Sequence, residues 1–486
     1  MSVKARQKME TLDTIIVGAG AAGIAAGCRL LENNVNNIIV LEAKNRIGGR
    51  IYSYEVDGSF LDIGGQWCHG QENNIVYLLS KELDILSLSI NCYDDYKMYS
   101  PTLSLDKKLI DDMLEIAFNI ERDKNGLISS SGSFGEYFIN RFNSEIKQKF
   151  GHDEQKLVIA KLFCDWYHKY TACLNACPTW FDLSAKGSAC YETCKGDYYL
   201  HFRNKGCQTI LDVLMKKIPN PADKLLLEDK IHLNKSVASI NWNNANGVLV
   251  HCLDGSSYKA KCVLVTASLG VLKKMHTKLF VPELPPYKVR VINELGFGTV
   301  NKIFLKFPVR WWSDDPKGIS IIWTDEDKKF ISKKNGKKWL EDIFGFYPID
   351  SHCNILLVWI VGEEAASVEH FSDDDILQGL MSILQYYMGN KYNIPNPTVL
   401  LRSRWFSDSQ SFGSYSYRTN ASEDLKLFGS DLAKPLCVNN KPVLLFAGEA
   451  TSDCHYSTIH GAINSGFREA ERIIDFYKDT ERKSKL

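Results

Sequence analysis

The chain has 486 residues, of which 45% are hydrophobic and 24% are charged, the proportions of an ordinary globular protein. Its 58 basic and 58 acidic side chains leave no formal net charge, so no basic surface points to a nucleic-acid partner. Apolar runs such as residues 355–361 fall far short of the roughly 18 residues that a membrane helix needs, and we expect no membrane partner. The length exceeds what one compact core usually holds, which predicts two domains.

The N-terminus and the cysteines indicate a chain that stays in a reducing compartment. Residues 1–10 lack the apolar core of a secretion signal. The 14 cysteines are scattered and include no Cys-x-x-Cys pair, so we expect reduced thiols rather than disulfides. We also expect no metal site, because zinc ligands usually follow one another at shorter spacings.

A glycine-rich turn follows the first apolar run. Residues 14–17 read as a strand and residues 24–31 as a helix, and between them stand Gly18, Gly20 and Gly23 in the spacing GxGxxG. The first glycine permits a tight turn, the second lets backbone approach a phosphate, and the third lets helix and strand pack closely. The positive end of the helix dipole favours negative charge. The order strand, turn and helix predicts a site for the pyrophosphate of a dinucleotide.

Charged residues follow at the positions that such a site uses. A second apolar strand, residues 38–41, ends in Glu42, about 20 residues after the glycines, where a carboxylate binds a ribose hydroxyl. Arg46 and Arg50 flank a second glycine pair, and guanidinium groups bind phosphate through paired hydrogen bonds. These residues extend the predicted phosphate site.

The chain returns to the same cofactor near its other end. Residues 443–446 read as a strand that leads into Gly448 and Glu449, which can place backbone amides and a carboxylate on a second part of the ligand. A nicotinamide enzyme of simple architecture would not need this return. The sequence therefore predicts FAD.

Blocks along nearly the whole chain resemble the flavin-containing amine oxidase family, and within it the polyamine oxidases. They comprise residues 18–23, 42–50, 62–70, 263–272, 297–302, 413–417, 446–449 and 456–461. The resemblance implies an α/β fold in which a Rossmann-like FAD-binding domain is interleaved with an α+β substrate-binding domain. We expect residues 1–95, 200–289 and 431–486 in the first domain and residues 96–199 and 290–430 in the second.

The apolar patterns predict helices and strands within these domains. Helices are expected over residues 109–118, 206–217, 375–388 and 466–477. Strands are expected over residues 236–242, 247–252, 263–266, 300–307 and 355–361.

The resemblance also implies a reaction. An amine, in its neutral form, passes hydride from the carbon beside nitrogen to a non-covalently bound flavin. Water hydrolyses the resulting imine, and dioxygen takes up the electrons as hydrogen peroxide. The flavin supplies the redox chemistry, and the protein supplies binding, orientation and a dry aromatic cavity.

Lys302 and His69 are the expected catalytic residues. In a strand, Lys302 faces the same side as Val300 and Phe304. The resemblance implies that it holds a water near the reactive nitrogen of the flavin, and the alternative is a solvated strand lysine. His69 lies in a Trp-x-His-Gly block, where the resemblance places a histidine facing the substrate amine. The alternative is a structural histidine beside a glycine turn.

The resemblance assigns further side chains to the two ligands. Residues expected to bind substrate are Trp67, His69, Tyr415, Tyr456 and Thr458. Residues expected to bind the cofactor are Gly18, Gly20, Ala22, Gly23, Glu42, Arg50, Gly64, Gly65, Gln66, Trp67, Val237, Trp405, Gly448, Glu449, Ser457 and Thr458.

Substrate choice depends on acids along the tunnel, because long polyamines carry several ammonium groups. Residues 173–180, where relatives can carry such an acid, contain none, and the nearest acids are Asp165, Asp182 and Glu192. A weakly charged tunnel favours an N1-acetylated polyamine over free spermine. Oxidation of free spermine stays open as the alternative.

Three other classes of protein share parts of this pattern. A monoamine oxidase would carry a membrane tail and a cysteine-linked flavin. A histone demethylase would carry chromatin-binding additions. A flavoprotein that keeps FAD without turnover would serve as an interaction module.

The chain ends in Ser484, Lys485 and Leu486. Ser-Lys-Leu at a free carboxyl terminus is a peroxisomal address, and the import receptor would be a partner. The alternative is a frayed, charged tail after the last helix and a cytoplasmic protein.

Overall fold

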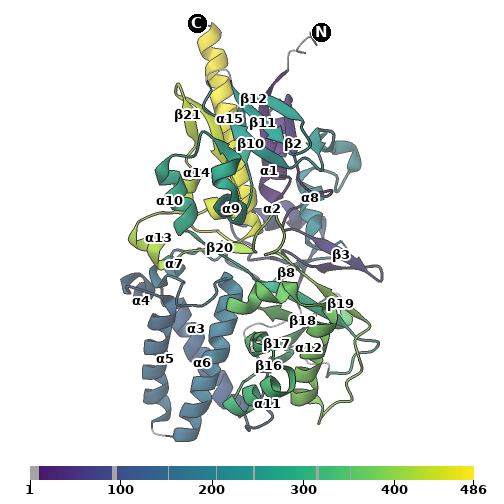
Figure 1. The fold of residues 1–486 in the computed structure, drawn as a ribbon, viewed down its shortest axis with the longest axis vertical. Coiled ribbons are helices and arrows are strands. Elements are labelled where there is room, and N and C mark those ends of the chain that lie inside the picture. The colour runs from purple at the N-terminus through teal and green to yellow at the C-terminus, as the bar shows by residue number, and fades with distance from the viewer. Residues whose placement is uncertain are drawn as a thin grey trace.

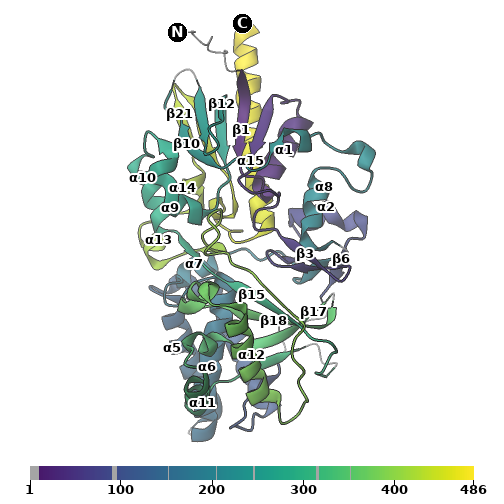
Figure 2. The ribbon, with the colours of Figure 1, turned by 45° about the vertical axis from the view of Figure 1, so that its right-hand side comes forward.

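The computed structural model describes residues 10–89, 96–151, 153–203, 205–244, 247–313, 317–350 and 352–485. Figures 1 and 2 show two lobes stacked along the long axis, one around a sheet beside the C-terminal helix and one around a second sheet and a group of helices. Within the described ranges, no helix combines the length and the apolar character needed to cross a membrane.

The first lobe contains a nine-stranded sheet. Its strands are β1 (Thr11–Val17), β2 (Ile38–Leu41), β9 (Ile231–His232), β10 (Val237–Asn241), β11 (Val248–Cys252), β12 (Ser257–Val265), β13 (Phe280–Val281), β21 (Leu436–Val438) and β22 (Lys441–Phe446). The central strands β2, β1, β12 and β22 run parallel, whereas β11 and β10 continue from β12 in antiparallel pairing. The parallel part is where residues 14–17 meet residues 38–41, as the glycine motif requires.

Helices cover both faces of this sheet. On one face lie α1 (Ala21–Glu32) and α15 (Ile459–Lys485), and on the other lie α9 (Leu269–Leu279), α10 (Pro286–Glu294) and α14 (Gly429–Ala433). Ile16 packs with residues of α1 and α15, whereas its neighbour Ile15 packs with residues of α9 and α14. Successive strand residues face opposite sides, so β1 buries Ile15 and Ile16 on its two faces.

The second lobe contains a six-stranded sheet. Its strands, in spatial order, are β19 (Val399–Arg402), β15 (Asn301–Lys306), β18 (His352–Ile360), β17 (Gly345–Ile349), β16 (Ile319–Ile321) and β7 (Met98–Tyr99). Helices α11 (Asp325–Asn335) and α12 (Asp373–Met388) pack on the face that carries Ile303 and Leu305. Lys302 therefore points from the opposite face of β15.

A group of helices completes this lobe. They are α3 (Lys107–Arg122), α4 (Lys124–Ser129), α5 (Phe134–Phe150), α6 (Glu154–Asn175) and α7 (Ala185–Ala189). Stacked aromatic rings form their core: Phe138 and Tyr167 have ring centres 4.8 Å apart, and those of Trp166 and Tyr170 are 5.5 Å apart. Figure 1 shows these helices at one side of the lower lobe, with α12 at the other.

Short elements surround the junction of the lobes. They are α2 (Ile75–Ser80), α8 (Thr209–Leu214), α13 (Asn420–Asp424), β3 (Ser53–Val56), β4 (Ser59–Asp62), β5 (Trp67–Cys68), β6 (Leu86–Leu88), β8 (Leu200–Phe202), β14 (Gly296–Gly298) and β20 (Tyr415–Tyr417). β5, β8 and β6 form a small sheet, and β14 pairs with β20.

The expected α/β fold with interleaved parts is confirmed. The nine-stranded sheet takes its strands from three separate stretches of chain, and the six-stranded sheet takes its strands from two others. We propose that these sheets are the cores of two domains with the boundaries expected from the sequence.

Two element predictions need correction. β12 begins at Ser257, earlier than the expected residues 263–266, because its first half pairs with β11. The helix expected over residues 466–477 is longer than expected: α15 runs from Ile459 to Lys485, and its last part is rich in the helix formers lysine, glutamate and arginine, so the alternative of a frayed tail after residue 477 does not hold. Figure 1 shows the end of this helix standing away from the sheet. Leu486 lies outside the described residues.

Candidate active site

A cavity of about 1050 Å³ is lined by residues from both lobes. It begins at the N-terminus of α1 and the end of β2, passes Arg50 and Gly448, and reaches the aromatic residues around Lys302. Every residue that the sequence assigned to cofactor or substrate lines this cavity except Gly23 and Arg46, whose guanidinium instead donates to the backbone oxygens of Ile47 and Gly49. The predicted groups are therefore brought together in one continuous space.

The glycine motif forms the first end of the cavity. Gly18 has φ of +105° and Gly20 is the N-cap of α1, with no side chain capping the helix. Uncapped backbone N–H groups at a helix start bind anions, so this end suits a pyrophosphate. Gly23 serves packing instead, because a Cβ there would lie 2.0 Å from the Gly18 oxygen.

Glu42 is held at the end of β2. Its carboxylate is buried and accepts hydrogen bonds from the backbone N–H groups of Ala19 and Lys44, both at 2.8 Å. These bonds fix the carboxylate beside the glycine turn, at the position expected for a ribose contact. Val237, at the start of β10, lines the same end.

An ion pair joins the two ends of the sequence within the cavity wall. Arg50 Nη1 donates to Glu449 Oε1 at 2.8 Å and to the Ser414 oxygen at 2.7 Å. The other carboxylate oxygen of Glu449 accepts from Ser457 N at 2.8 Å and from Ser416 Oγ at 2.5 Å. Glu449 thus orders Arg50 and Ser457 as part of the wall.

Gly448 leaves an opening beside this ion pair. Its φ is +129°, and a Cβ at this position would meet no atom within 4 Å. The backbone conformation requires glycine, and its face is open to the cavity. Space beside exposed backbone is what a close ligand contact needs.

Lys302 is buried at the other end, with only 5% of its surface exposed. Nζ donates to the backbone oxygens of Asp62 and Gly64 and to Gln66 Oε1, each at 2.8 Å. Burial lowers the pKa of Lys302 to about 8, although the Asp62 carboxylate opposes that shift. The burial excludes the alternative of a solvated strand lysine.

His69 and Trp67 stand beside this lysine. The His69 ring lies 4.6 Å from that of Tyr198 and 6.0 Å from that of Trp67, between ring centres. Nδ1 lies 3.3 Å from the Tyr198 oxygen, and burial lowers the pKa of His69 to about 4. The imidazole is neutral at pH 7 and faces the cavity.

The remaining predicted residues complete the walls. Tyr415 OH donates to the Cys173 oxygen at 2.5 Å, and the Tyr456 ring packs 5.3 Å from that of Tyr191. Thr458 Oγ1 donates to the His455 oxygen and accepts from Gly461 N, which fixes the start of α15. Trp405, Gly64 and Gly65 line the cavity near Lys302.

Several cavity residues were not expected from the sequence, and three of them lie close to the predicted site. Trp359 lies opposite Lys302 on β18, and the Tyr198 ring lies beside that of His69, tilted by 36°. Glu121, in the last turn of α3, accepts a hydrogen bond from Tyr167 OH at 2.5 Å and also lines the cavity. Glu121 follows Ala117 and Phe118 at helical spacing, and an acid on that apolar stripe was the available signal.

Glu121 supplies the cavity with an acid that residues 173–180 lack. The nearest acids expected from the sequence, Asp165, Asp182 and Glu192, do not line the cavity. Glu121 does. Burial raises the pKa of Tyr198, and the charge of Glu121 adds to that rise, which places Glu121 on the side of the cavity where Tyr198 lies beside His69. The other acids that line the cavity, Glu42, Asp408 and Glu449, lie around the predicted cofactor cradle, so Glu121 is the carboxylate at the aromatic end.

Comparisons with known proteins agree with this geometry. The family model described as flavin containing amine oxidoreductase matches residues 21–474. The peroxisomal N(1)-acetyl-spermine/spermidine oxidase of Bos taurus is 30% identical over 95% of this chain and 94% of its own length. The Homo sapiens protein of the same name is 29% identical, with 95% of each chain covered. A putrescine oxidase structure with bound putrescine has a TM-score of 0.70 at 18% identity, over 96% of this chain and 99% of that one.

Proposed function

The chain belongs to the flavin-containing amine oxidoreductase family, with FAD as its cofactor, and we propose that it oxidises a secondary amine within an N1-acetylated polyamine. The observation that carries this proposal is the continuous cavity, which joins a dinucleotide cradle to an aromatic chamber containing Lys302 and His69. The names of the bovine and human relatives support the same substrate class.

The cradle fits FAD by its donor groups. The uncapped start of α1 would hold the pyrophosphate, and Glu42 would hold the ribose. The open backbone at Gly448 and the ordered Arg50 would contact the middle of the cofactor. Gly64, Gly65, Gln66, Trp67 and Trp405 would surround the flavin ring. When bound, FAD accepts the hydride from the carbon beside the amine nitrogen.

The aromatic walls serve the amine. Trp67, Trp359, Tyr415 and Tyr456 line the chamber and exclude water, which favours the neutral amine that can form an imine. His69, through its ring nitrogens, offers a hydrogen bond to the amine. These residues orient the substrate and leave its nitrogen lone pair available.

Lys302 holds or moves a proton at Nζ. Its three acceptors match the three protons of an ammonium group, and loss of one proton leaves one acceptor without a donor. The lowered pKa makes that loss accessible near pH 8. The overall reaction would convert amine, water and dioxygen into an aldehyde, a shorter amine and hydrogen peroxide.

Glu121 supports a substrate with few charges. A single carboxylate can pair with one distal ammonium group, and an N1-acetylated polyamine has a neutral amide in place of one terminal charge. Free spermine has more ammonium groups to satisfy. Oxidation of free spermine is the second candidate, because the Glu121 carboxylate could equally pair with one of the ammonium groups of spermine.

A panel of substrates tests the proposal. Peroxide release should give kcat/KM values in which N1-acetylspermine and N1-acetylspermidine exceed spermine and spermidine. A clear preference for free spermine would replace the proposal with spermine oxidation. Protein that binds FAD but oxidises none of these amines would be a non-catalytic flavoprotein.

We also propose peroxisomal import by the receptor that reads Ser-Lys-Leu. The tripeptide Ser484, Lys485 and Leu486 and the peroxisomal names of the bovine and human relatives support this proposal. A cytoplasmic location is the alternative.

A further inference from the structure

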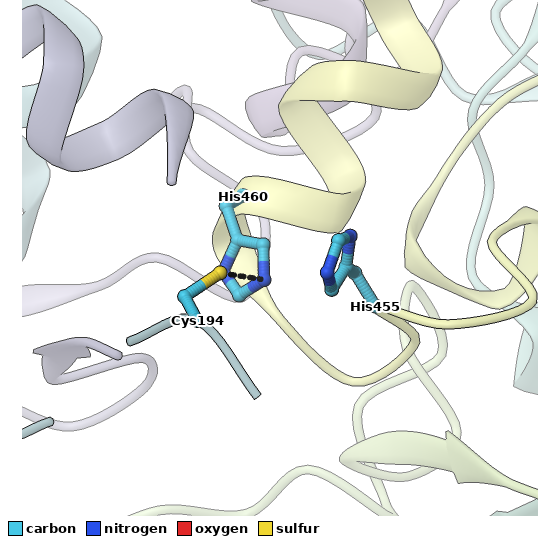
Figure 3. Close-up of side chains that lie close together, drawn as sticks. All are labelled: Cys194, His455 and His460. Atoms are coloured by element: carbon cyan, nitrogen blue, oxygen red, sulfur yellow. Dashed lines mark hydrogen bonds between the residues drawn. The ribbon is translucent and has the colours of Figure 1, made fainter. Parts of the chain in front are cut away.

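A cysteine and two histidines gather beside the cavity, and the proposed oxidation uses none of them. The ligand atoms of Cys194, His455 and His460 all lie within 4.8 Å of one another (Figure 3). Cys194 Sγ lies 4.0 Å from His460 Nε2, and the two imidazole rings have centres 4.8 Å apart. Figure 3 shows all three side chains converging on the space between the start of α15 and the chain segment of Cys194.

The backbone holds the three residues in place. Glu192 N donates to the Cys454 oxygen at 3.0 Å, which ties the segment of Cys194 to the loop before α15. Thr458 Oγ1 donates to the His455 oxygen and accepts from Gly461 N, so it joins the loop of His455 to the first turn of α15, which carries His460. Cys194 and His460 are buried. The cluster is therefore a built feature of two segments far apart in sequence.

We propose that Cys194, His455 and His460 bind a zinc ion. Zinc takes cysteine sulfur and histidine nitrogen together, and this donor set is too soft for calcium or magnesium. In a tetrahedral zinc site the ligand atoms lie roughly 3.3–3.8 Å apart, since each stands about 2.0–2.3 Å from the metal. Small side-chain rotations bring the present separations into that range.

A fourth ligand is available nearby. Glu192, Cys454 and His455 form a second group with ligand atoms within 4.8 Å of one another, and Cys454 Sγ lies 3.8 Å from His455 Nδ1. The two groups share His455, and a side chain of the second group that reached the same ion, or a water, would complete its coordination. The proposal departs from the expectation of no metal site, because the three ligands come from separate segments that spacing along the sequence does not bring together.

Zinc would connect two walls of the active-site cavity. Cys194 lines the cavity itself, and Tyr456, Ser457 and Thr458 lie between the two histidines and line it too. A metal that bridges these segments would fix the wall against which substrate and cofactor lie. Zinc binding would thus stabilise the folded holoprotein, a linkage that needs no turnover to be detected.

Metal binding to the FAD-containing protein tests the proposal. After treatment with a chelator, equilibrium dialysis should show one tightly bound Zn²⁺ per chain. Co²⁺ should bind at the same site and give tetrahedral ligand-field bands at wavelengths beyond the flavin absorption, with thiolate charge-transfer intensity. Zn²⁺ should also raise the Tm.

Matched variants separate the cluster from the rest of the surface. Cys194→Ser and His455→Gln should each weaken Zn²⁺ binding at least a hundredfold, and His455 is only half-buried, so its variant should fold even where Cys194→Ser does not. Cys437→Ser and His370→Gln, at exposed positions, should bind like the wild type. Absence of a stoichiometric site in the wild type, or equal binding by His455→Gln and the controls, would overturn the proposal.

Discussion

Lys302 and Trp359 face each other across the pairing of β15 with β18, and the lysine nitrogen lies 5.0 Å from the centre of the indole ring. The same nitrogen lies 5.8 Å from the centre of the Trp67 ring. Aromatic faces attract a cation, while burial beside them disfavours charge. The lysine is thus poised between its two protonation states inside the chamber.

Lys302→Met should keep the fold and FAD but slow flavin reduction, reoxidation or both by tenfold or more, which is about 1.4 kcal/mol of barrier. The reason is that Lys302 is the lysine of β15 that lines the cavity, where its Nζ donates to Gln66. Stopped-flow absorbance measures each half-reaction. Lys306→Met, on the same face of the same strand and paired with Asp57 at its outer end, is the matched control. Unchanged rates in Lys302→Met would leave the lysine a structural role alone.

The same lysine should give the protein a stability term that depends on pH. The pKa of Lys302 is about 8 in the folded protein and 10.5 in the unfolded chain. Between these values the unfolded chain binds more protons, so the folded state gains stability as pH rises. The free energy of unfolding of the wild type should therefore increase relative to that of Lys302→Met across this window. Denaturant unfolding at several pH values measures the difference, and a difference independent of pH would contradict the assignment.

Glu121→Gln should raise KM at least tenfold, about 1.4 kcal/mol, for polyamines that keep a free terminal ammonium group. Glutamine preserves the size of the side chain and can still accept the hydrogen bond from Tyr167, so the loss reports charge. Glu115→Gln, exposed on the same helix, is the control. Equal KM values for wild type and Glu121→Gln would show that the distal ammonium binds elsewhere.

The purified protein should be yellow and hold one FAD without a covalent bond. The cofactor site is split between the glycine turn and Gly448, and the groups that would hold FAD there are backbone N–H groups, Glu42 and Arg50. Acid precipitation should therefore release the flavin into the supernatant. Flavin colour that remains in the pellet would mean a covalent link.

A fluorescent protein fused to the N-terminus should give puncta that overlap a peroxisomal marker, because the fusion leaves Ser484, Lys485 and Leu486 at a free carboxyl terminus. Deletion of these three residues should make the signal diffuse and leave oxidase activity unchanged. A diffuse signal from the intact fusion would favour the cytoplasmic location.

The parts of the site that could be predicted from the sequence are mostly short motifs whose residues are close together along the chain. The glycine turn and Glu42 stand close in sequence, and their geometry follows from strand, turn and helix alone. The sequence could not predict whether Lys302 is buried. The alternation of side chains along a strand shows which face of the strand the lysine is on, but not what packs against that face.

Contacts between segments that are distant along the chain could not be predicted from the sequence. Glu121 reaches the cavity only because the helices of the second lobe pack as they do, and Trp359 meets Lys302 only through the register of β15 and β18. The zinc ligands Cys194 and His460 are likewise brought together by folding across 266 positions. The spacing of residues along one segment can predict a metal site within that segment, but not a site whose ligands come from two segments.

The pairing of Arg50 with Glu449 has a consequence for how the protein is made. These residues are 399 positions apart, and β22, which leads into Glu449, completes the sheet beside β12. A ribosome emits the chain from the N-terminus, so the glycine turn is available long before its partners. Tight binding of FAD must therefore wait until translation is nearly finished. A chain released before Glu449 has been added would come off the ribosome without bound FAD.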